Sequence, residues 1–234
     1  MKREVLTEVL ADLKAKRPAV LATWLDGGRS QVLHPFDASE AGDAALRAGA
    51  RAAAEADQAR LLETAEGRVL LRVFNPPVRV VIVGAVHIAQ ALAPMVQLCG
   101  HDVLVIDPRR AYAAPERFRG VPLVTAWPEE ALAQAALDRR AALVAMTHDP
   151  KIDDPALIAA LRSDAFYVGA IGSKKTQAAR RERLSAKGFD GAALARIHGP
   201  VGLAIGARSP GEIAVSVLAQ IVARLRRADA AVAG

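Results

Sequence analysis

The chain has 234 residues, of which 52% are hydrophobic and 4% aromatic, and its formal net charge is +6. This length and composition predict a globular protein with one full domain and a smaller one. No apolar stretch reaches the roughly 18 residues of a membrane span and the N-terminal segment is charged, so we expect a cytoplasmic protein. The single cysteine, Cys99, excludes an intrachain disulfide and a metal site with several cysteine ligands.

The excess positive charge is concentrated in two clusters and raises the question of an anionic partner. Basic residues near a helix C-terminus complement its dipole, which explains the cluster at 224–227 without a function. Aromatic residues do not alternate with either cluster, so the stacking surfaces of single-strand binders are missing and no nucleic acid partner is expected. The clusters are Lys174, Lys175, Arg180, Arg181 and Arg183, and then Arg224, Arg226 and Arg227.

Residues 1–77 predict a small α+β domain. The segment Asn75-Pro76-Pro77 at the end of this range indicates a linker, because proline cannot extend a strand ladder and restricts the residue before it. The spacing of apolar residues predicts a helix over 4–16, strands over 19–24 and 31–34, a helix over 44–60 and a strand over 69–74.

Residues 78–234 predict an α/β domain with a Rossmann-like, doubly wound parallel sheet, because strand and helix patterns alternate. Ligands of such sheets bind outside the carboxyl ends of the strands. The loops that begin at Gly84, Asp107, Thr147 and Gly169 should therefore share one crevice. The expected strands are 78–83, 103–106, 122–125, 141–146 and 166–170.

The turn after the first of these strands has the outline of a dinucleotide-binding fingerprint. Gly84 can make the tight turn, whereas Val86 stands where a second glycine usually lets the backbone approach a pyrophosphate. His87 opens the following helix and could donate a hydrogen bond to a ligand. Asp107 lies about 20 residues further on, where an acid can accept bonds from ribose hydroxyls. The alternative for the Gly84 turn is a tight connection that binds no ligand, and the alternative for Asp107 is a solvated strand end.

The segment Thr147-His148-Asp149-Pro150 follows the strand at 141–146, so its side chains should lie at the rim of the sheet. His148 and Asp149 could orient a ligand, share a proton or contact a metal. One histidine and one acid fall short of the three or four ligands of a stable metal site. No serine or cysteine nucleophile stands at a recognisable turn, so we assign no catalytic residue.

Residues 167–176 predict a strand, a glycine turn and a helix start that together suit an anion. Gly172 permits close approach of the backbone, Ser173 can cap the helix, and Lys174 and Thr176 add a charge and a hydroxyl. The spacing differs from that of a Walker loop. A capped helix with a solvated basic face is the alternative.

Two other helix starts have a structural explanation. The segment Ser209-Pro210-Gly211-Glu212 predicts a capping box with proline at the first helical position, and Asp154-Pro155 predicts an acidic cap followed by proline.

An ordered set of segments is more specific than any one of these motifs. It consists of residues 84–89, 105–109, 116–118, 147–150, 153–157, 167–173, 200–203 and 205–207. This set, spread over about 78–225, resembles the XdhC/CoxI family of xanthine dehydrogenase accessory proteins. The resemblance implies a cofactor chaperone more than an enzyme. Such a chaperone binds molybdenum cofactor, takes part in its sulfuration and delivers it to a molybdenum hydroxylase.

The resemblance implies molybdopterin or its dinucleotide form as the cofactor and a molybdenum hydroxylase apoenzyme as the partner. A cysteine desulfurase and a second copy of the chain, as a homodimer, are further candidate partners. The family turn usually reads Gly-Ala-Gly-His, from which Val86 departs, and residues 1–77 lack the family's glycine-rich and Cys-Gly-Gly segments, so this domain is shortened or divergent. The residues expected to contact the cofactor are Gly84, Ala85, Val86, His87, Asp107, Arg109, Thr147, His148, Asp149, Gly169, Gly172, Ser173, Lys174 and Thr176.

Two other functions remain open at this point. Gly84 and Asp107 also suit an NAD(P)-dependent oxidoreductase, although the side chain of Val86 should crowd the pyrophosphate. The third candidate is a noncatalytic Rossmann module that senses a nucleotide.

Overall fold

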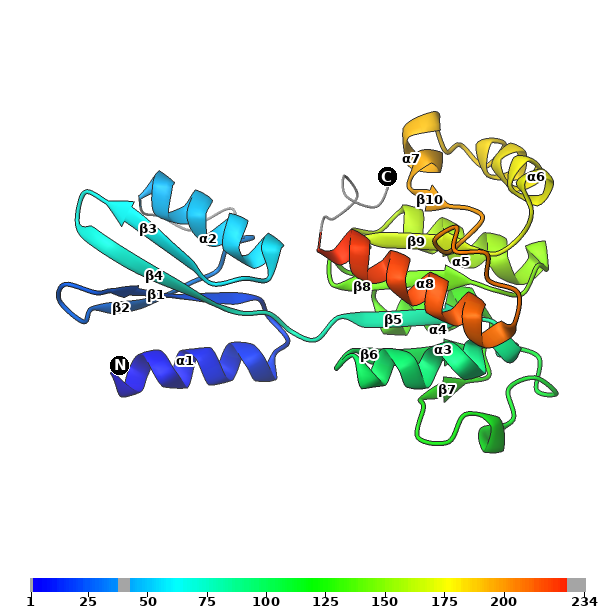
Figure 1. The fold of residues 1–234 in the computed structure, drawn as a ribbon, viewed down its shortest axis with the longest axis horizontal. Coiled ribbons are helices and arrows are strands. Elements are labelled where there is room, and N and C mark those ends of the chain that lie inside the picture. Colours follow the sequence, from blue (N-terminus) through cyan, green and yellow to red (C-terminus); the bar gives the residue numbers. More distant parts are fainter. Residues whose placement is uncertain (1, 38–42, 227–234) are drawn as a thin grey trace. The chain divides into compact units, whose positions relative to one another are not determined.

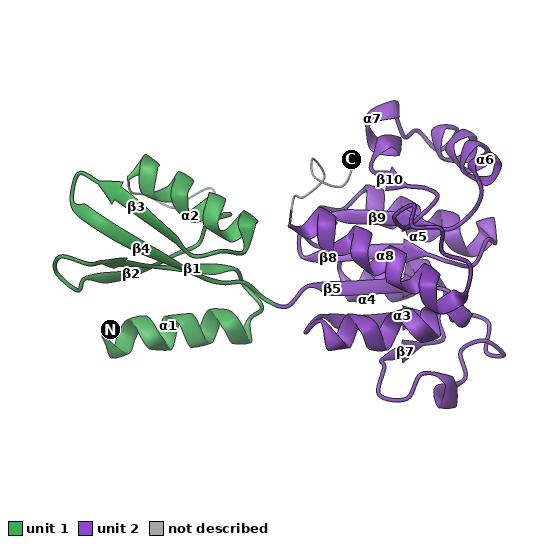
Figure 2. Cartoon of the chain, in the orientation of Figure 1, with its two compact units in different colours: residues 1–76 green, residues 77–234 purple. Residues whose placement is uncertain are grey.

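The computed structural model of the chain describes residues 2–37 and 43–226, so Arg227 and the rest of the predicted second domain beyond it lie outside the described residues. The chain divides into two compact units, residues 1–76 and 77–234, which we call unit 1 and unit 2 (Figure 2). Among the described residues, none of the helices combines the length and the apolarity needed to cross a membrane.

Unit 1 is a four-stranded antiparallel sheet with one helix on each face (Figure 1). Side chains alternate along the strands: Val20 and Trp24 pack on the side of the second helix, and Leu21 packs with Val9 of the first. The order across the sheet is β2-β1-β4-β3. The elements are α1 (Arg3–Lys14), β1 (Ala19–Trp24), β2 (Ser30–Leu33), α2 (Ala44–Ala56), β3 (Arg60–Thr64) and β4 (Gly67–Phe74).

The helix predicted over 44–60 was too long, because α2 ends at Ala56. Asp57 adopts a left-handed conformation with φ of 54°, and its N–H bonds to the carbonyls of the last turn, which ends the helix. The chain then enters β3, an edge strand that the sequence analysis missed. Most side chains of β3 are exposed, so its sequence lacks the alternation that marks a half-buried strand.

Unit 2 is a doubly wound α/β fold with a six-stranded parallel sheet, as predicted. Its order is β10-β9-β8-β5-β6-β7, so the chain starts in the middle at β5 and the strand order reverses between β5 and β8. The added strand β10 has two residues, one of them a histidine, and was not predicted. The strands are β5 (Arg79–Val83), β6 (Asp102–Ile106), β7 (Leu123–Val124), β8 (Ala141–Ala145), β9 (Tyr167–Ala170) and β10 (Ile197–His198).

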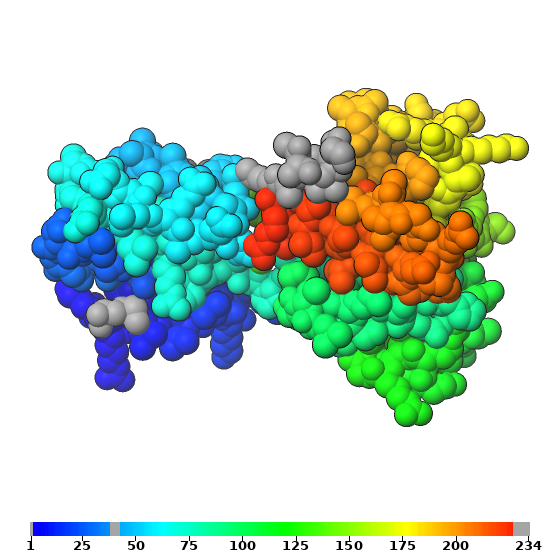
Figure 3. Space-filling model, viewed as in Figure 1, coloured from blue at the N-terminus to red at the C-terminus, as the bar shows by residue number. Residues whose placement is uncertain are grey.

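Helices cover both faces of this sheet. On one face α3 (His87–Leu98) and α8 (Pro210–Leu225) pack side by side, which is also visible on the surface (Figures 1 and 3). The other face carries α4 (Pro128–Ala135), α5 (Pro150–Leu161), α6 (Lys174–Ser185) and the short α7 (Gly191–Ala195). A short 3-10 helix, η1 (Pro115–Arg117), lies between β6 and β7 in the chain. Because both faces are buried, the central strands are continuous apolar runs.

The capping box before α8 is confirmed: the Ser209 hydroxyl accepts from the backbone of Glu212, and the Glu212 side chain accepts from that of Ser209. The cap predicted at Asp154-Pro155 is wrong. The chain has a second Asp-Pro pair five residues earlier, and α5 begins there, with Asp149 accepting a bond from the N–H of Lys151. Pro155 therefore lies inside the helix.

Candidate functional site

Parallel pairing places the carboxyl ends of β5, β6, β8 and β9 at one edge of the unit 2 sheet. We call this the carboxyl edge. The loops that follow these strands carry nearly all of the residues that the sequence analysis selected. The reversal of strand order falls between β5 and β8, which is the position where ligands of open α/β sheets bind.

Gly84 forms the turn after β5 and contacts the loop after β8. Its φ of +117° is one that residues with a Cβ rarely adopt, and a Cβ added there would lie 2.8 Å from Cγ2 of Thr147. Its N–H donates to the carbonyl of Ile106 at 2.8 Å. The position therefore requires glycine for a reason within the protein itself, because the two loops meet at the switch point.

Val86 and His87 form the start of α3. Val86 is the N-cap residue in an extended conformation, its side chain makes no capping bond, and it packs against the core on the side of α3 and α8. His87 is the first helical residue and is exposed. The first N–H groups of α3 lack partners within the helix and lie beside this turn.

Asp107 ties the end of β6 to the Gly84 turn. Its buried carboxylate accepts from the backbone N–H of Ala85 at 2.8 Å and from that of Arg109 at 2.9 Å. The Arg109 guanidinium closes a two-pronged pair with it, Nε to Oδ1 at 2.9 Å and Nη2 to Oδ2 at 2.8 Å. Arg109 in turn stacks over the ring of Tyr112 at 4.1 Å.

These bonds affect the pKa of Asp107 and its capacity to accept further hydrogen bonds. Burial raises the pKa of its carboxyl, but the hydrogen bonds from Arg109 and Ala85 and the arginine charge outweigh burial, so the pKa lies below its usual value. A carboxylate has about four acceptor sites, and four donors already occupy them here. The ribose contact expected for Asp107 would have to displace one of these bonds.

Asp153 holds the loop after β8 from inside. In the sequence this residue stood out only as part of the segment 153–157, one of those that resemble the XdhC/CoxI family. The buried carboxylate of Asp153 accepts from the backbone N–H groups of Thr147 and His148 at 3.1 Å each, and from the Thr147 hydroxyl at 2.7 Å. His148 is exposed and has a φ of 64°, unusual for a residue other than glycine. Asp149 is committed to capping α5.

Asp153 also joins this loop to the loop after β9 through Arg180. The side chain of Arg180 is 2% exposed. Its Nη2 lies 3.2 Å from Oδ2 of Asp153, and its Nη1 donates to the carbonyl of Ile171 at 3.1 Å. Nη1 also donates to Oε1 of Gln177, whose amide donates to the carbonyl of Ala170. Burial lowers the pKa of Arg180, and the charge of Asp153 opposes that change.

Two residues of the basic cluster on α6 therefore differ from the expected solvated face or anion seat. Arg180 is buried in the network just described, and Arg183 pairs with Asp154, Nε to Oδ2 at 2.6 Å, which raises the pKa of that arginine. Gln177, Arg180 and Leu184 are buried on α6 at positions i, i+3 and i+7. That spacing was the available sequence signal for a buried arginine.

The loop after β9 forms a small cradle at the start of α6. Gly172 has a φ of +126°, and a Cβ there would lie 2.8 Å from Cγ2 of Thr176. Ser173 is the N-cap, as predicted, and its hydroxyl accepts from the backbone N–H of Thr176 at 3.2 Å. Lys174 and Lys175 are exposed in the first turn of the helix. Backbone donors, hydroxyls and ammonium groups are thus close together.

Gly169 has a different role from the one expected. It lies inside β9 and is buried, and a Cβ there would meet Cγ2 of Val201 at 2.6 Å and the ring of Tyr167 at 2.9 Å. The glycine therefore permits packing between β9 and the segment after β10. The loop itself begins only after Ala170.

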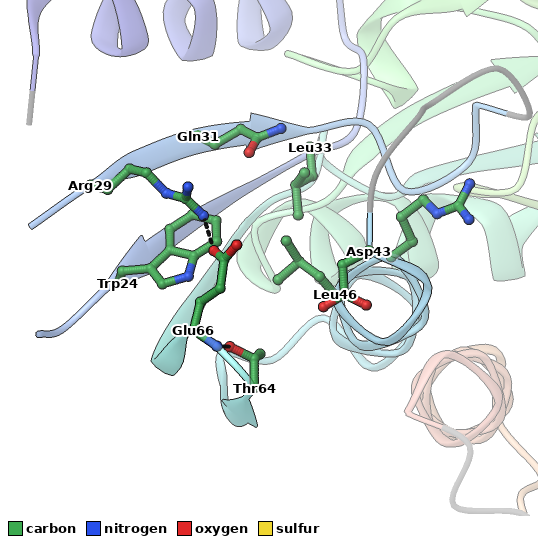
Figure 4. Close-up of a pocket in the computed structure, with 9 residues that line it drawn as sticks. Trp24, Arg29, Gln31, Leu33, Asp43, Leu46, Thr64 and Glu66 are labelled. Carbon is green, nitrogen blue, oxygen red and sulfur yellow. Dashed lines mark hydrogen bonds and ion pairs between the residues drawn. The ribbon is translucent and has the colours of Figure 1, made fainter. Parts of the chain in front are cut away.

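A separate concavity lies in unit 1, of about 120 Å³, bounded by the sheet and α2 (Figure 4). The guanidinium of Arg29 lies 3.7 Å from the centre of the Trp24 ring and pairs with Glu66. The indole Nε1 of Trp24 is buried without a hydrogen-bond partner among the described residues. Arg29 and Glu66 thus neutralise each other at this concavity.

The parallel sheet with helices on both faces and a glycine turn at its switch point defines a Rossmann-type domain. Residues 80–221, more than half of the chain, match the sequence profile of the XdhC Rossmann domain. The chain belongs to the XdhC family, which confirms the resemblance found in the sequence.

Two curated relatives are similar to this chain over about two thirds of its length. A probable xanthine dehydrogenase component from Bacillus subtilis (strain 168) is 32% identical over 155 residues, which cover 66% of this chain and 45% of the relative. The molybdenum cofactor insertion chaperone PaoD from Escherichia coli (strain K12) is 31% identical over 148 residues, 63% of this chain and 40% of the relative. The aligned region thus spans less than half the length of either relative.

A crystal structure described as a xanthine dehydrogenase from Bacillus halodurans has a similar fold. The TM-score is 0.69 at 22% sequence identity, and the match covers 96% of this chain and 65% of the other. At this identity the likeness shows a shared fold.

Proposed function

We propose that this protein is an accessory protein that binds molybdenum cofactor at the carboxyl edge of unit 2. In this proposal it supports sulfuration of the cofactor and its insertion into a molybdenum hydroxylase of the xanthine dehydrogenase or carbon monoxide dehydrogenase type. Membership of the XdhC family and the similarity to PaoD support the class of ligand. The hydroxylase apoenzyme is the proposed partner; a cysteine desulfurase and a second copy of the chain are further proposed partners.

The cradle at the start of α6 is the observation that carries this proposal. Molybdopterin ends in a phosphate, or in a pyrophosphate in its dinucleotide form. A helix N-terminus offers backbone N–H groups and a favourable dipole to such an anion. Gly172 makes the tight turn that a Cβ beside Thr176 would obstruct, and Lys174 adds an exposed ammonium group in the first turn of the helix. The residues present therefore fit the anionic end of the cofactor.

A chaperone must release its cargo, so moderate affinity is sufficient. A dissociation constant on the order of micromolar corresponds to about 8 kcal/mol of binding free energy. Charge-assisted bonds to one terminal phosphate, together with contacts along the carboxyl edge, are enough to supply that free energy.

The direct test is to purify the protein from cells that make the cofactor and to measure pterin fluorescence after release. We expect pterin to copurify and added cofactor to raise the melting temperature. Absence of pterin together with an unchanged melting temperature would contradict the proposal.

Substitutions then locate the site. Lys174→Ala should weaken cofactor binding by about 1 kcal/mol or more if the contact is charge-assisted. Gly172→Val should obstruct the cradle. Lys187→Ala is the matched control, because this exposed lysine follows the other end of α6, about 20 Å away at 1.5 Å per helical residue. Unchanged affinity in both site variants would remove this loop from the site.

The alternative of an NAD(P)-dependent oxidoreductase has less support. The ribose acceptor that it needs, Asp107, already holds four donors, and Val86 occupies the close-approach position. Titration with NADH and NADPH should give no saturable fluorescence transfer. A nucleotide-sensing module remains distinguishable from both, since it needs a partner whose activity changes with the nucleotide.

A further inference from the structure

Unit 1 brings two carboxylates and an imidazole together. Glu8 and Asp12 lie four residues apart on α1, and His34 directly follows β2. One ligand atom from each of the three lies within 4.8 Å of the others. Nε2 of His34 is already 2.9 Å from Oδ2 of Asp12. Three side chains that can ligate a metal therefore converge at one point.

The local fold explains why they converge. Side chains alternate along a strand, so His34 faces the same side of the sheet as Val32, and Val32 packs against α1. Residues i and i+4 lie on one face of a helix, which places Glu8 above Asp12 on the side turned to β2. Figure 1 shows α1 lying along this side of the sheet.

The electrostatics of the cluster favour a cation. Two carboxylates one helical turn apart repel each other, and Asp12 is a buried residue, so water screens its charge poorly. Nη1 of Arg17 lies 3.7 Å from Oδ1 of Asp12, and Arg17 also pairs with Asp37. This guanidinium holds Oδ1 and turns Oδ2 toward His34. The guanidinium of Arg17 is thus shared between Asp12 and Asp37.

We propose that Glu8, Asp12 and His34 bind a divalent transition-metal ion, with Zn²⁺ as the best match. Zn²⁺ accepts histidine nitrogen and carboxylate oxygen at about 2.0–2.2 Å, usually with four ligands. Mg²⁺ and Ca²⁺ prefer oxygen ligands alone, which the imidazole does not provide. The ion replaces the hydrogen bond between His34 and Asp12, the displaced proton leaves to solvent, and water completes the coordination.

The geometry requires only a small adjustment. Ligand atoms around a tetrahedral Zn²⁺ are about 3.3 Å apart, and His34 and Asp12 are already close to that spacing. Glu8 is exposed, so rotation of its side chain closes the remaining distance. The bound ion ties α1 to the end of β2.

The test uses the full chain without a histidine tag, stripped of metal, in a Cys99→Ser background so that the exposed thiol cannot bind. Zn²⁺ is titrated by calorimetry, and Co²⁺ is used as a spectroscopic probe of tetrahedral coordination. We expect one equivalent of Zn²⁺, visible Co²⁺ bands, and a higher melting temperature with Zn²⁺. Glu8→Gln and His34→Ala should each weaken binding about tenfold or more, and Glu8→Gln tests this without touching a buried group.

Two controls isolate the cluster. Glu63→Gln removes the same charge from an exposed position on β3, and His101→Ala removes an imidazole from unit 2; neither should change the affinity. The proposal is overturned if the wild type shows no saturable binding below about 1 mM, which corresponds to about 4 kcal/mol. It is equally overturned if Glu8→Gln and His34→Ala bind as tightly as the controls.

Discussion

At the scale of single residues, the carboxyl edge contains positions whose identity the protein itself requires. Gly84 combines a positive φ with a close approach to Thr147, and Asp107 holds both the Gly84 turn and Arg109. Either residue suggests a ligand contact when only the sequence is known. In the structure both first serve to keep the loops after β5, β6 and β8 together, and ligand contact is an additional role for that framework.

Gly84→Ala should destabilise unit 2 by about 1–3 kcal/mol, because alanine is strained at this φ and its Cβ would contact Thr147. Gly211→Ala is the matched control: Gly211 lies in the first turn of α8 with open space around it, so alanine should be neutral or stabilising by up to about 1 kcal/mol. Urea unfolding measures both. Equal effects of the two substitutions would show that the Gly84 turn is not constrained as described.

Asp107→Asn should lower the free energy of unfolding by about 2 kcal/mol at pH 7, because charge-assisted bonds to a buried carboxylate are lost. The folded pKa of Asp107 lies below the unfolded value of about 3.9, so the wild-type advantage is complete above that pH and is lost as the pH falls toward the folded pKa. Unfolding of both proteins between pH 7 and pH 3 checks this. If the difference in free energy of unfolding between the wild type and Asp107→Asn stays constant over that range, the lowered pKa of Asp107 is contradicted.

At the scale of elements, the buried pair of Asp153 and Arg180 connects α5 and α6 to two loops of the carboxyl edge. Asp153 holds the backbone of Thr147 and His148, and Arg180 holds the carbonyl of Ile171. Removing one partner leaves the other buried without a counter-charge. The pair thus acts as a positioning device for the loops that carry the proposed cofactor site.

Arg180→Met and Asp153→Asn should each lower the free energy of unfolding by about 3–5 kcal/mol, since each leaves an uncompensated buried group. The double variant should be less destabilised than the sum of the two. Amide hydrogen exchange supplies the second readout: the N–H groups of Thr147 and His148 should lose protection in Asp153→Asn. Additive losses, or protection that does not change, would show that the two residues act separately.

Elements were predictable from the sequence where they are buried on both sides. β5, β6, β8 and β9 are apolar runs that a parallel sheet produces, and their boundaries differ from the predicted ones by about one residue. β3 was missed because it is an exposed edge strand, and β10 because its two residues include a polar histidine and precede Gly199-Pro200, whereas the equally short β7 is apolar. The pairing of Asp153 with Arg180 spans 27 residues, and local patterns carry no information about such a contact.

At the scale of the whole molecule, the chain consists of two units with separate cores. Each of the four clusters of buried apolar residues draws its members from one unit, two from unit 1 and two from unit 2. All residues of the proposed cofactor site belong to unit 2, and the proposed metal site belongs to unit 1. The two proposals can therefore be tested on the full chain and fail independently.

The fragment 77–234 should fold by itself and keep the affinity for molybdenum cofactor within about threefold, or about 0.7 kcal/mol, of that of the full chain. A unit of this size can bury enough apolar surface to be stable, whereas the 76 residues of unit 1 are closer to the lower limit. Cooperative thermal unfolding followed by circular dichroism tests folding, with Ile82→Ala as a control that should cost about 2–5 kcal/mol. A fragment that unfolds cooperatively but loses cofactor binding, while the full chain retains it, would show that unit 1 supplies part of the site.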